Sequence, residues 1–469
     1  MNVLLITADD MNWDAVGAFG CPTKGTTPNI DRLAESGLRF NHGHVTIAVC
    51  QPSRSALMTG RYPHRSGGEG FYHLRFDRVP ILPNILRQAG YAVGILGKKG
   101  HSTPYADFEW DMAFDQAELG MGRNPEVYYG HARDFVTAAV AAKRPFFLMA
   151  NSHDPHRPFY GNDREEWYSK TDPPAVPPSH TFDPSEVVVP AFLPDIPEVR
   201  LEIAEYYSSV RRCDDTAGRL LDVLDETGVA DDTLVMFLSD NGMAFPFAKT
   251  NCYLNSTRTP WLARWPKVIQ AGCVDDTHFV SGVDFMPTVL DAVGIDVPEG
   301  VDGHSFLPVL HGEKQENRKL VFTQFHQTSA RRNFPMRCVQ NKRFGYIFNP
   351  WSNGERAFRN ESQSGRTWKA MEVAAEQDDA IASRNRLFSY RVLEEFYDFE
   401  NDPDALHNLI DDPKYASEID KLRDALELWM AEFDDVALDA FVNRGSQKAL
   451  DRMMALVDEE IGAREDDIS

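Results

Sequence analysis

The chain of 469 residues has little cysteine, a shortage of positive charge and no long apolar run. Its six cysteines, at positions 21, 50, 213, 252, 273 and 338, are too few and too scattered for a disulfide framework, and no close pair resembles a zinc site. No apolar run approaches the ~20 residues that span a bilayer. The formal net charge of −23 argues against nucleic acid or an anionic membrane as a partner. We therefore expect a soluble globular protein.

The length predicts one large domain and a smaller one, because a single core rarely grows to this size. The N-terminus, Met1-Asn2-Val3-Leu4-Leu5-Ile6-Thr7, has no basic region of a signal peptide and is typical of a first core strand. As the chain stands we expect a cytoplasmic protein, and a periplasmic or secreted one if a leader has been removed.

Two acids follow this first strand directly. In an open α/β sheet, ligands gather at the carboxyl ends of the strands. Adjacent carboxylates repel each other, so a bound cation explains Asp9 and Asp10 more economically than a structural role does. Oxygen ligands indicate calcium or magnesium. The alternative is that the pair caps a helix.

Basic residues and histidines follow two further predicted strands. Residues 91–96 lead into Gly97-Lys98-Lys99-Gly100-His101, and residues 144–150 lead into Asn151-Ser152-His153-Asp154-Pro155-His156-Arg157-Pro158. Two histidines and an arginine in a proline-rich loop after a core strand are well placed for an anionic ligand. Solvated lysines at a strand end and a structural histidine are the alternatives.

One stretch carries a specific signature: Cys50-Gln51-Pro52-Ser53-Arg54-Ser55-Ala56-Leu57-Met58-Thr59-Gly60-Arg61. It resembles the signature of the type I, formylglycine-dependent sulfatases, and it matches at every fixed position. The alternative is that Cys50 is an ordinary buried thiol. Within the family the chain most resembles the sulfamidases, and the supporting stretches are His153-Asp154-Pro155-His156-Arg157, Ser239-Asp240-Asn241-Gly242 and Pro335-Met336-Arg337.

The resemblance implies a mechanism. In the family a formylglycine-generating enzyme oxidises the cysteine to an aldehyde, which hydrates to a gem-diol. One hydroxyl attacks the sulfur and forms a covalent sulfo-enzyme intermediate, as in other nucleophilic catalysis. The second hydroxyl then drives elimination of sulfate. The implied reaction is hydrolysis of sulfate esters or sulfamates, on a sulfated sugar resembling N-sulfoglucosamine.

The resemblance also assigns roles to residues. It implies one divalent cation, calcium rather than magnesium, bound by Asp9, Asp10, Asp240, Asn241 and the modified Cys50. Arg54 and His101 would hold the aldehyde, with His101 as the base for elimination. The implied sulfate contacts are Lys98 and Lys249, His153 is the candidate acid, and Lys99, His156 and Arg157 are further substrate-binding candidates.

The implied fold is an alkaline phosphatase-like α/β sandwich with a large, mixed, mostly parallel sheet. We divide the chain into a catalytic domain, residues 1–334, and a C-terminal α+β subdomain with an antiparallel sheet, residues 335–469. Residues 320–324 would form a last strand of the large sheet. Residues 336–340 and 344–348 would be antiparallel strands, and residues 415–433 a helix with one buried stripe.

Two departures from the sulfamidase pattern bear on the substrate. One extra residue precedes His101, which leaves Lys98 and Lys99 as alternatives with Lys98 favoured, and Lys249 stands where the sulfamidases have arginine. Two other functions stay open: a phosphonate or phosphate monoester hydrolase of the same fold, and a non-catalytic binder of sulfated glycans if Cys50 is unmodified. A homodimer is compatible with the sequence, but no motif indicates it.

Overall fold

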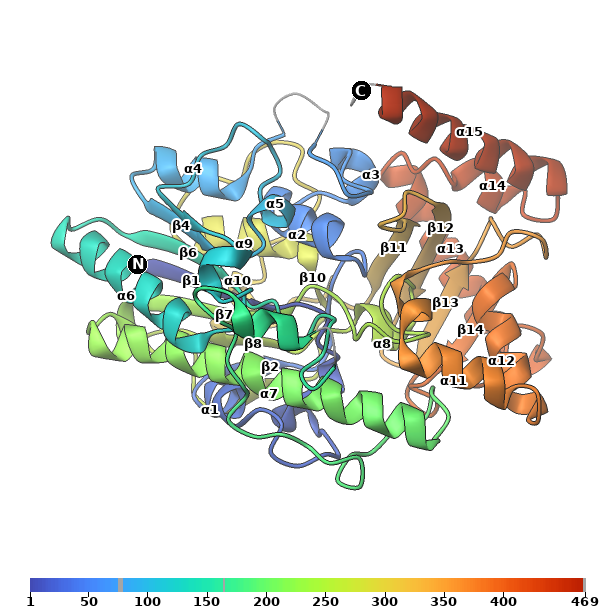
Figure 1. The fold of residues 1–469 in the computed structure, drawn as a ribbon. Coiled ribbons are helices and arrows are strands. Elements are labelled where there is room, and N and C mark those ends of the chain that lie inside the picture. The colour runs from blue at the N-terminus through green and yellow to red at the C-terminus, as the bar shows by residue number, and fades with distance from the viewer. Residues whose placement is uncertain (75–78, 163–164, 467–469) are drawn as a thin grey trace.

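The computed structural model describes residues 1–74, 79–162 and 165–466. In this part of the chain an eight-stranded sheet and a four-stranded sheet lie side by side, each with its own helices (Figure 1). The large sheet has the order β5-β4-β6-β1-β7-β8-β2-β9. Its strands are β1 (Asn2–Ala8), β2 (Leu38–Phe40), β4 (Ala92–Leu96), β5 (Met112–Phe114), β6 (Phe146–Asn151), β7 (Thr233–Ser239), β8 (Trp261–Arg264) and β9 (Cys273–Asp275).

The centre of the large sheet is parallel and buried on both faces. β1 pairs in parallel with β6 on one side and β7 on the other. Side chains alternate along a strand, so Leu4 and Ile6 of β1 enter one hydrophobic core while Val3 and Leu5 enter the other. The helices that accompany the large sheet are α1 (Pro28–Glu35), α2 (Cys50–Thr59), α3 (Pro63–Ser66), α4 (Leu82–Gln88), α5 (Lys99–Ser102), α6 (Pro125–Ala141), α7 (Pro197–Glu226), α8 (Leu254–Thr257), α9 (Phe285–Ala292) and α10 (Leu307–Leu310). A short parallel pair, β3 (Gly43–His44) with β10 (Val280–Ser281), forms a separate two-stranded sheet.

The small sheet is antiparallel throughout and consists of β11 (Val321–Gln327), β12 (Asn333–Gln340), β13 (Phe344–Phe348) and β14 (Glu394–Asp398). Its helices are α11 (Arg366–Ala374), α12 (Asp379–Tyr390), α13 (Ala416–Glu432), α14 (Leu438–Val442) and α15 (Gln447–Asp466). Leu422, Leu426 and Trp429 of α13 share a core with Tyr346 and Phe348 of β13, which confirms the predicted buried stripe.

The predicted α/β architecture is confirmed, with one correction to the strand assignment. Residues 320–324 do not end the large sheet: they fall in β11, which pairs with β12 in the small sheet. Between the two strands, Thr328 N–H donates to Arg332 C=O at 3.0 Å, so a short turn closes β11 onto its neighbour in sequence. Such a hairpin is cheaper in chain entropy than a long return to the large sheet. The division after residue 334 stays a prediction, although β12 runs across that point.

Two absences predicted from the sequence can be compared with the structure. All six cysteines are free. Among the described helices, none combines the length and the apolarity needed to cross a bilayer.

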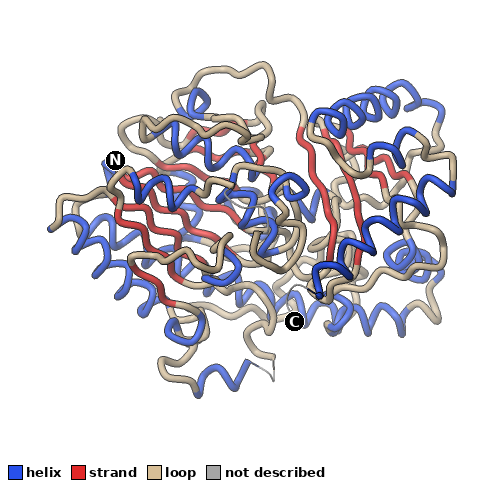
Figure 2. The backbone as a smooth tube through the Cα atoms, turned by 90° about the horizontal axis from the view of Figure 1, so that it is seen from above, coloured by secondary structure: helices blue, strands red, loops and turns tan. Residues whose placement is uncertain are grey.

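The topology gathers functional segments at one edge of the large sheet. The neighbouring strands β4, β6, β1 and β7 are parallel, so their carboxyl ends share that edge. The small sheet is fixed close by, because Gln324 of β11 donates its backbone N–H to Thr46 C=O at 3.0 Å. Figure 2 shows the two groups of strands with loops and helices between them. The site described next is built where they meet.

Candidate active site

Three carboxylates and one amide converge at the ends of β1 and β7. The register pairs Ala8 with Ser239, so Asp9 and Asp10 emerge beside Asp240 and Asn241. The Asp10 N–H donates to Asp240 Oδ1 at 3.2 Å, and Asn241 Nδ2 donates to Asp10 Oδ1 at 2.7 Å. All four residues are fully buried. The structure therefore brings together the four side chains that the sequence predicted as metal ligands.

The donor set fits a hard divalent cation. Oxygen atoms of the three carboxylates lie within 4.8 Å of one another. The amide oxygen Oδ1 of Asn241 is buried and has no hydrogen-bond partner among the described residues, which is costly unless a ligand occupies that position. Oxygen-only ligands with several carboxylates are typical of calcium and magnesium sites.

Three cations face these carboxylates, two of them buried and Lys98 with a side chain that is 10% exposed. Arg54 Nε donates to Asp240 Oδ2 at 2.9 Å, Lys98 Nζ forms an ion pair with Asp9, and Lys249 Nζ lies 2.8 Å from Asp10 Oδ1. Burial opposes ionisation of Asp9, but Lys98 and the other cations outweigh it and hold its pKa well below the usual range. Burial raises the pKa of Asp240 to about 7 in the absence of a metal. A divalent cation would favour ionisation of all three carboxylates and, with the three side-chain cations, would leave a local positive excess. That excess suits an anionic substrate in a chain whose net charge is −23.

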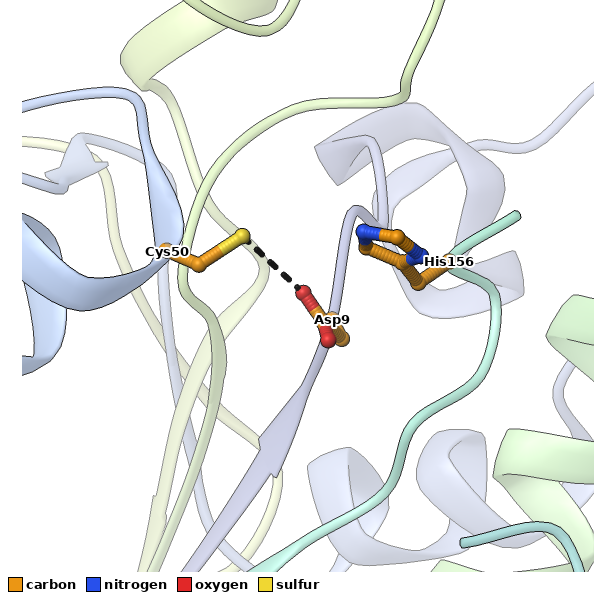
Figure 3. Close-up of side chains that lie close together, drawn as sticks. All are labelled: Asp9, Cys50 and His156. Carbon is orange, nitrogen blue, oxygen red and sulfur yellow. Dashed lines mark hydrogen bonds between the residues drawn. The ribbon is translucent and has the colours of Figure 1, made fainter. Parts of the chain in front are cut away.

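Cys50 is the first residue of α2, and its side chain points toward Asp9 of the carboxylate cluster (Figure 3). Its Sγ lies 3.4 Å from Asp9 Oδ1, and only 2% of the residue is exposed. Burial raises the pKa of the thiol well above its usual range. An unmodified Cys50 is therefore protonated at neutral pH and a poor nucleophile, since the thiolate is the reactive form.

His156 is the histidine that reaches the cluster. Its Nε2 lies 3.9 Å from Asp10 Oδ2, and its Nδ1 lies 2.6 Å from the Arg157 carbonyl oxygen, to which it donates. The other ring nitrogen, Nε2, therefore faces the carboxylates of the site. His153, the predicted acid, is buried, and its Nε2 accepts the Lys98 N–H at 3.2 Å. Burial, with Lys98 nearby, holds the pKa of His153 well below its usual value, so His153 is a neutral ring.

His101 and the preceding lysines lie at the start of α5, which packs against α2. Lys98 adopts a left-handed backbone conformation, φ 51°, and its side chain turns to Asp9, whereas the Lys99 side chain is exposed. The Nδ1 of His101 is buried without a hydrogen-bond partner in the described structure. Burial and Lys98 lower its pKa to about 3, so His101 is neutral and able to accept a proton.

Arg157, a predicted substrate contact, is already engaged elsewhere. It forms an ion pair with Glu202 of α7, and its Nη2 donates to the Ala244 carbonyl oxygen at 3.1 Å. Glu202 also accepts the backbone N–H groups of Arg366 and Thr367 at the start of α11. Arg157 therefore helps to join the elements around the large sheet to those around the small sheet.

Sequence reasoning missed Glu361, which the small domain contributes. It is the first residue of a short 3-10 helix, η7 (Glu361–Ser364). Its Oε2 lies 3.1 Å from Lys249 Nζ and its Oε1 lies 3.5 Å from His156 Nε2. Burial opposes its ionisation, but Lys249 and His156 lower its pKa to about 2. No motif surrounds Glu361, and only the tertiary fold brings it to the site.

Comparison with protein families gives two matches. Residues 1–295 match the sulfatase family, and residues 243–353 match the C-terminal part of N-sulphoglucosamine sulphohydrolase. The chain is 32% identical to human N-sulphoglucosamine sulphohydrolase, covering 92% of this chain and 90% of that protein. It is 28% identical to an ulvan-active sulfatase of Formosa agariphila, covering 93% of this chain and 81% of the relative.

Solved structures share the fold at lower identity. A protein solved in complex with its substrate D-glucosamine-2-N,6-O-disulfate has a TM-score of 0.69 at 20% identity, covering 92% of this chain and 98% of that one. The phosphonate monoester hydrolase of Agrobacterium radiobacter has a TM-score of 0.65 at 20% identity, covering 92% of this chain and 96% of that one. These likenesses show the fold, while the family matches show the kinship: the chain is an enzyme of the sulfatase family.

Proposed function

We propose that the chain hydrolyses the sulfamate of an N-sulfoglucosamine residue, or a closely related sulfate ester, with formylglycine at position 50. The observation that carries the proposal is the position of Cys50: it starts α2 and points at a buried, oxygen-rich cluster suited to a divalent cation. The choice of sugar is supported by the similarity to human N-sulphoglucosamine sulphohydrolase, which extends into the small domain.

The aldehyde, once formed by a formylglycine-generating enzyme, would supply a geminal diol: one hydroxyl to attack sulfur and one to drive release of sulfate. Asp9, Asp10, Asp240 and Asn241 would hold the cation, calcium rather than magnesium, which would polarise the sulfate oxygens. Lys98 and Lys249 would then turn part of their charge toward the sulfate, because the cation takes over the neutralisation of Asp9 and Asp10. Positively charged groups fixed in a buried site stabilise charge that develops on the reacting oxygens.

Two histidines, His101 and His156, are the candidates for proton transfer. Neutral His101, with an unpartnered Nδ1, is suited to accept the proton of the second hydroxyl during elimination. The leaving amine or alcohol needs a proton, and His156 is the candidate donor because its Nε2 faces Asp10 and Glu361. His153, whose Nε2 already accepts the Lys98 N–H, is better suited to hold the Lys98 backbone in its left-handed conformation.

A phosphonate or phosphate monoester hydrolase is the second candidate, because phosphonate hydrolases have this fold. The donor set and the cations would serve a tetrahedral phosphate as well. The two candidate functions can be separated by comparing the turnover of N-sulfoglucosamine, an aryl sulfate and an aryl phosphonate by one enzyme preparation. We expect the sulfamate to have the highest kcat/KM.

The decisive experiment combines mass spectrometry with kinetics. The tryptic peptide that carries residue 50 should show the mass of formylglycine, and the converted fraction should scale with activity across preparations. Full activity from protein that contains only plain cysteine would refute the proposal. Full conversion without turnover of any sulfated sugar would instead favour a glycan-binding protein.

A further inference from the structure

A second cavity adjoins the catalytic centre on the side of the small domain. Its volume is about 570 Å³, and it is lined by the turn between β11 and β12 and by the segment that leads into η7: Thr328, Ser329, Ala330, Arg332, Arg359, Asn360 and Glu361. Glu361 forms the wall that it shares with the site, because this side chain also contacts Lys249 and His156. A molecule that fills the catalytic centre and extends past Glu361 would enter this cavity.

Both walls of the cavity are fixed relative to the catalytic residues. On one side, β11 is bonded through Gln324 N–H to Thr46, four residues before Cys50 in the sequence. On the other, Asn360 Nδ2 donates to Thr250 Oγ1 at 2.5 Å, and Thr250 directly follows Lys249. The cavity therefore keeps a defined position relative to a bound substrate.

The cavity carries uncompensated positive charge. Arg332 and Arg359 are exposed, and neither side chain forms a hydrogen bond or ion pair with any residue in the described ranges. Arginines close to them are paired, for example Arg356 with Asp458. The acid in the lining, Glu361, is already paired with Lys249. In a chain with 71 acidic and 48 basic residues, two unpaired guanidinium groups beside one cavity indicate an anionic ligand.

We propose that this cavity, the Arg332–Arg359 cavity, binds an acidic group on the sugar that is joined to the one bearing the scissile sulfate. The inference rests on the proposed function and narrows its substrate to acidic oligosaccharides. A guanidinium group is a planar fork that matches the two oxygens of a carboxylate or the face of a sulfate. Glu361, between the two anion-binding regions, repels acidic groups and leaves the space beside it to hydroxyl or amine groups of the sugar.

We expect the cavity to act on binding and not on the chemical step, because in the described structure neither arginine forms a hydrogen bond or ion pair with Cys50 or the carboxylate cluster. Its loss should therefore raise KM for an acidic oligosaccharide and leave kcat unchanged. Exposed charge pairs contribute modestly, so we expect a rise of about five- to tenfold when both arginines are removed. The effect should shrink as salt is added, since the contacts are exposed.

The test uses full-length enzyme with verified formylglycine and a matched set of substrates. These are N-sulfoglucosamine alone, its disaccharides with glucuronic acid and with glucose, which differ by one carboxylate, and the disaccharide with 6-O-sulfated glucose. The variants are Arg332→Ala/Arg359→Ala and a control, Lys267→Ala. Lys267 pairs with Asp232 just before the amino end of β7, at the opposite edge of the sheet.

We expect the double variant to raise KM for the glucuronic acid disaccharide, the sulfated disaccharide or both, and to leave the glucose disaccharide and the monosaccharide unchanged. The affected substrate then identifies the acidic group as a carboxylate or a sulfate. The control should behave as wild type. An unchanged KM for both acidic disaccharides would overturn the proposal.

A second arm tests the neighbouring cavity and the case of an inactive enzyme. Lys369, exposed beside Arg157 and Glu361, lines a separate cavity of about 460 Å³. If Lys369→Ala raises KM for the acidic disaccharides and the double variant does not, the acidic group binds in that cavity and the proposal is wrong.

If no substrate is turned over, the proposed reaction fails. Calorimetric titration with the glucuronic acid disaccharide then tests whether the Arg332–Arg359 cavity binds the acidic group. Weaker binding to the double variant than to wild type supports the cavity, and equal or absent binding refutes it.

Discussion

Glu361 Oε2 lies 3.1 Å from Lys249 Nζ, so the small domain contributes a carboxylate to a cation of the catalytic centre. Lys249 is also paired with Asp10, and its charge is shared between a predicted metal ligand and this second acid. The small domain is thus part of the site and not only a support for it. Its acid reduces the positive charge that an anion meets at the mouth.

Removing that negative charge should strengthen the binding of anions. In Glu361→Gln, the shape is kept while Lys249 and His156 lose a negative neighbour. At low salt we expect the inhibition constant Ki of inorganic sulfate to be about three- to tenfold lower for Glu361→Gln than for wild type. This is the size of effect expected when one partly exposed charge interaction is lost. The measurement is Ki for sulfate, with Glu376→Gln, an exposed acid beyond the end of α11, as the control. Weaker inhibition in Glu361→Gln would show that the carboxylate does not oppose the anion.

Lys98 and Lys99 offer a matched pair of substitutions. Lys98 contacts Asp9 in the buried cluster, whereas the side chain of Lys99 is exposed. Lys98→Ala should lower kcat/KM by about 100-fold or more, the loss typical of a group that stabilises charge in a transition state. Lys99→Ala should stay near wild type. Steady-state kinetics on N-sulfoglucosamine decides, and the opposite ranking would assign the sulfate contact to Lys99.

A chelator should remove activity and lower stability together. A cation at 100 times its dissociation constant stabilises the folded state by about 2.7 kcal/mol, so its removal should lower the free energy of unfolding by a similar amount. We expect calcium to restore both properties at lower concentration than magnesium. In Asn241→Ala, which lacks the unpartnered amide oxygen, more calcium should be needed. Thermal unfolding that does not respond to chelator, in a preparation shown by metal analysis to contain the ion, would contradict the assignment.

A buried ion pair in the small domain links its stability to pH. Arg337 Nη2 donates to Asp435 Oδ1 at 2.8 Å, and both side chains are fully buried. Burial opposes ionisation of Asp435, but Arg337 outweighs it and holds the pKa of this carboxyl well below the usual range. The pair therefore contributes stability above the unfolded pKa of about 3.9, and that contribution is lost as the pH falls toward the folded value.

Asp435→Asn should lower the free energy of unfolding by about 3–5 kcal/mol at neutral pH, because it leaves Arg337 buried without a charge partner. Its stability should also fall less than that of wild type between pH 5 and the acid limit of folding, a range set by the unfolded pKa of about 3.9. Denaturant titrations across this range measure both effects. Glu316→Gln, which removes an exposed partner of Lys319, serves as the control and should change little. Parallel pH profiles for wild type and Asp435→Asn would rule out the linkage.

Much of the site could be predicted because parallel strands share an edge. Asp9 and Asp240 follow strands that proved to be neighbours, so local patterns were sufficient to bring their carboxylates together. The assignment of residues 320–324 to the large sheet failed because strand periodicity does not say which sheet a strand joins. No sequence motif predicted that Glu361 belongs to the site. It lies 112 residues from Lys249 in the sequence, and only the tertiary packing brings these two residues into contact.

The last prediction concerns Cys50→Ser. The serine hydroxyl would lie near the position of Cys50 Sγ, which is 3.4 Å from Asp9 Oδ1, and would face the same cations. If it attacks sulfur, the product is a sulfated serine with no neighbouring hydroxyl to expel the sulfate. We expect at most one slow turnover and a mass gain of one sulfo group on the peptide that carries residue 50. His101→Ala in the formylglycine enzyme should accumulate sulfated protein as well, because it lacks the base for elimination.

Two measurements separate this chemistry from a loss of folding. Cys50→Ser should keep the thermal stability of wild type to within a few degrees, since one small side chain replaces another. His101→Ala also removes a ring that packs against Phe71, so its thermal stability is measured alongside. The sulfated species should appear on mixing with N-sulfoglucosamine and not with glucosamine. If His101→Ala is unstable and carries no sulfate, His101 has a packing role. Repeated turnover by Cys50→Ser at a rate near that of wild type would show that an aldehyde at position 50 is dispensable, because a single hydroxyl has no route to eliminate sulfate.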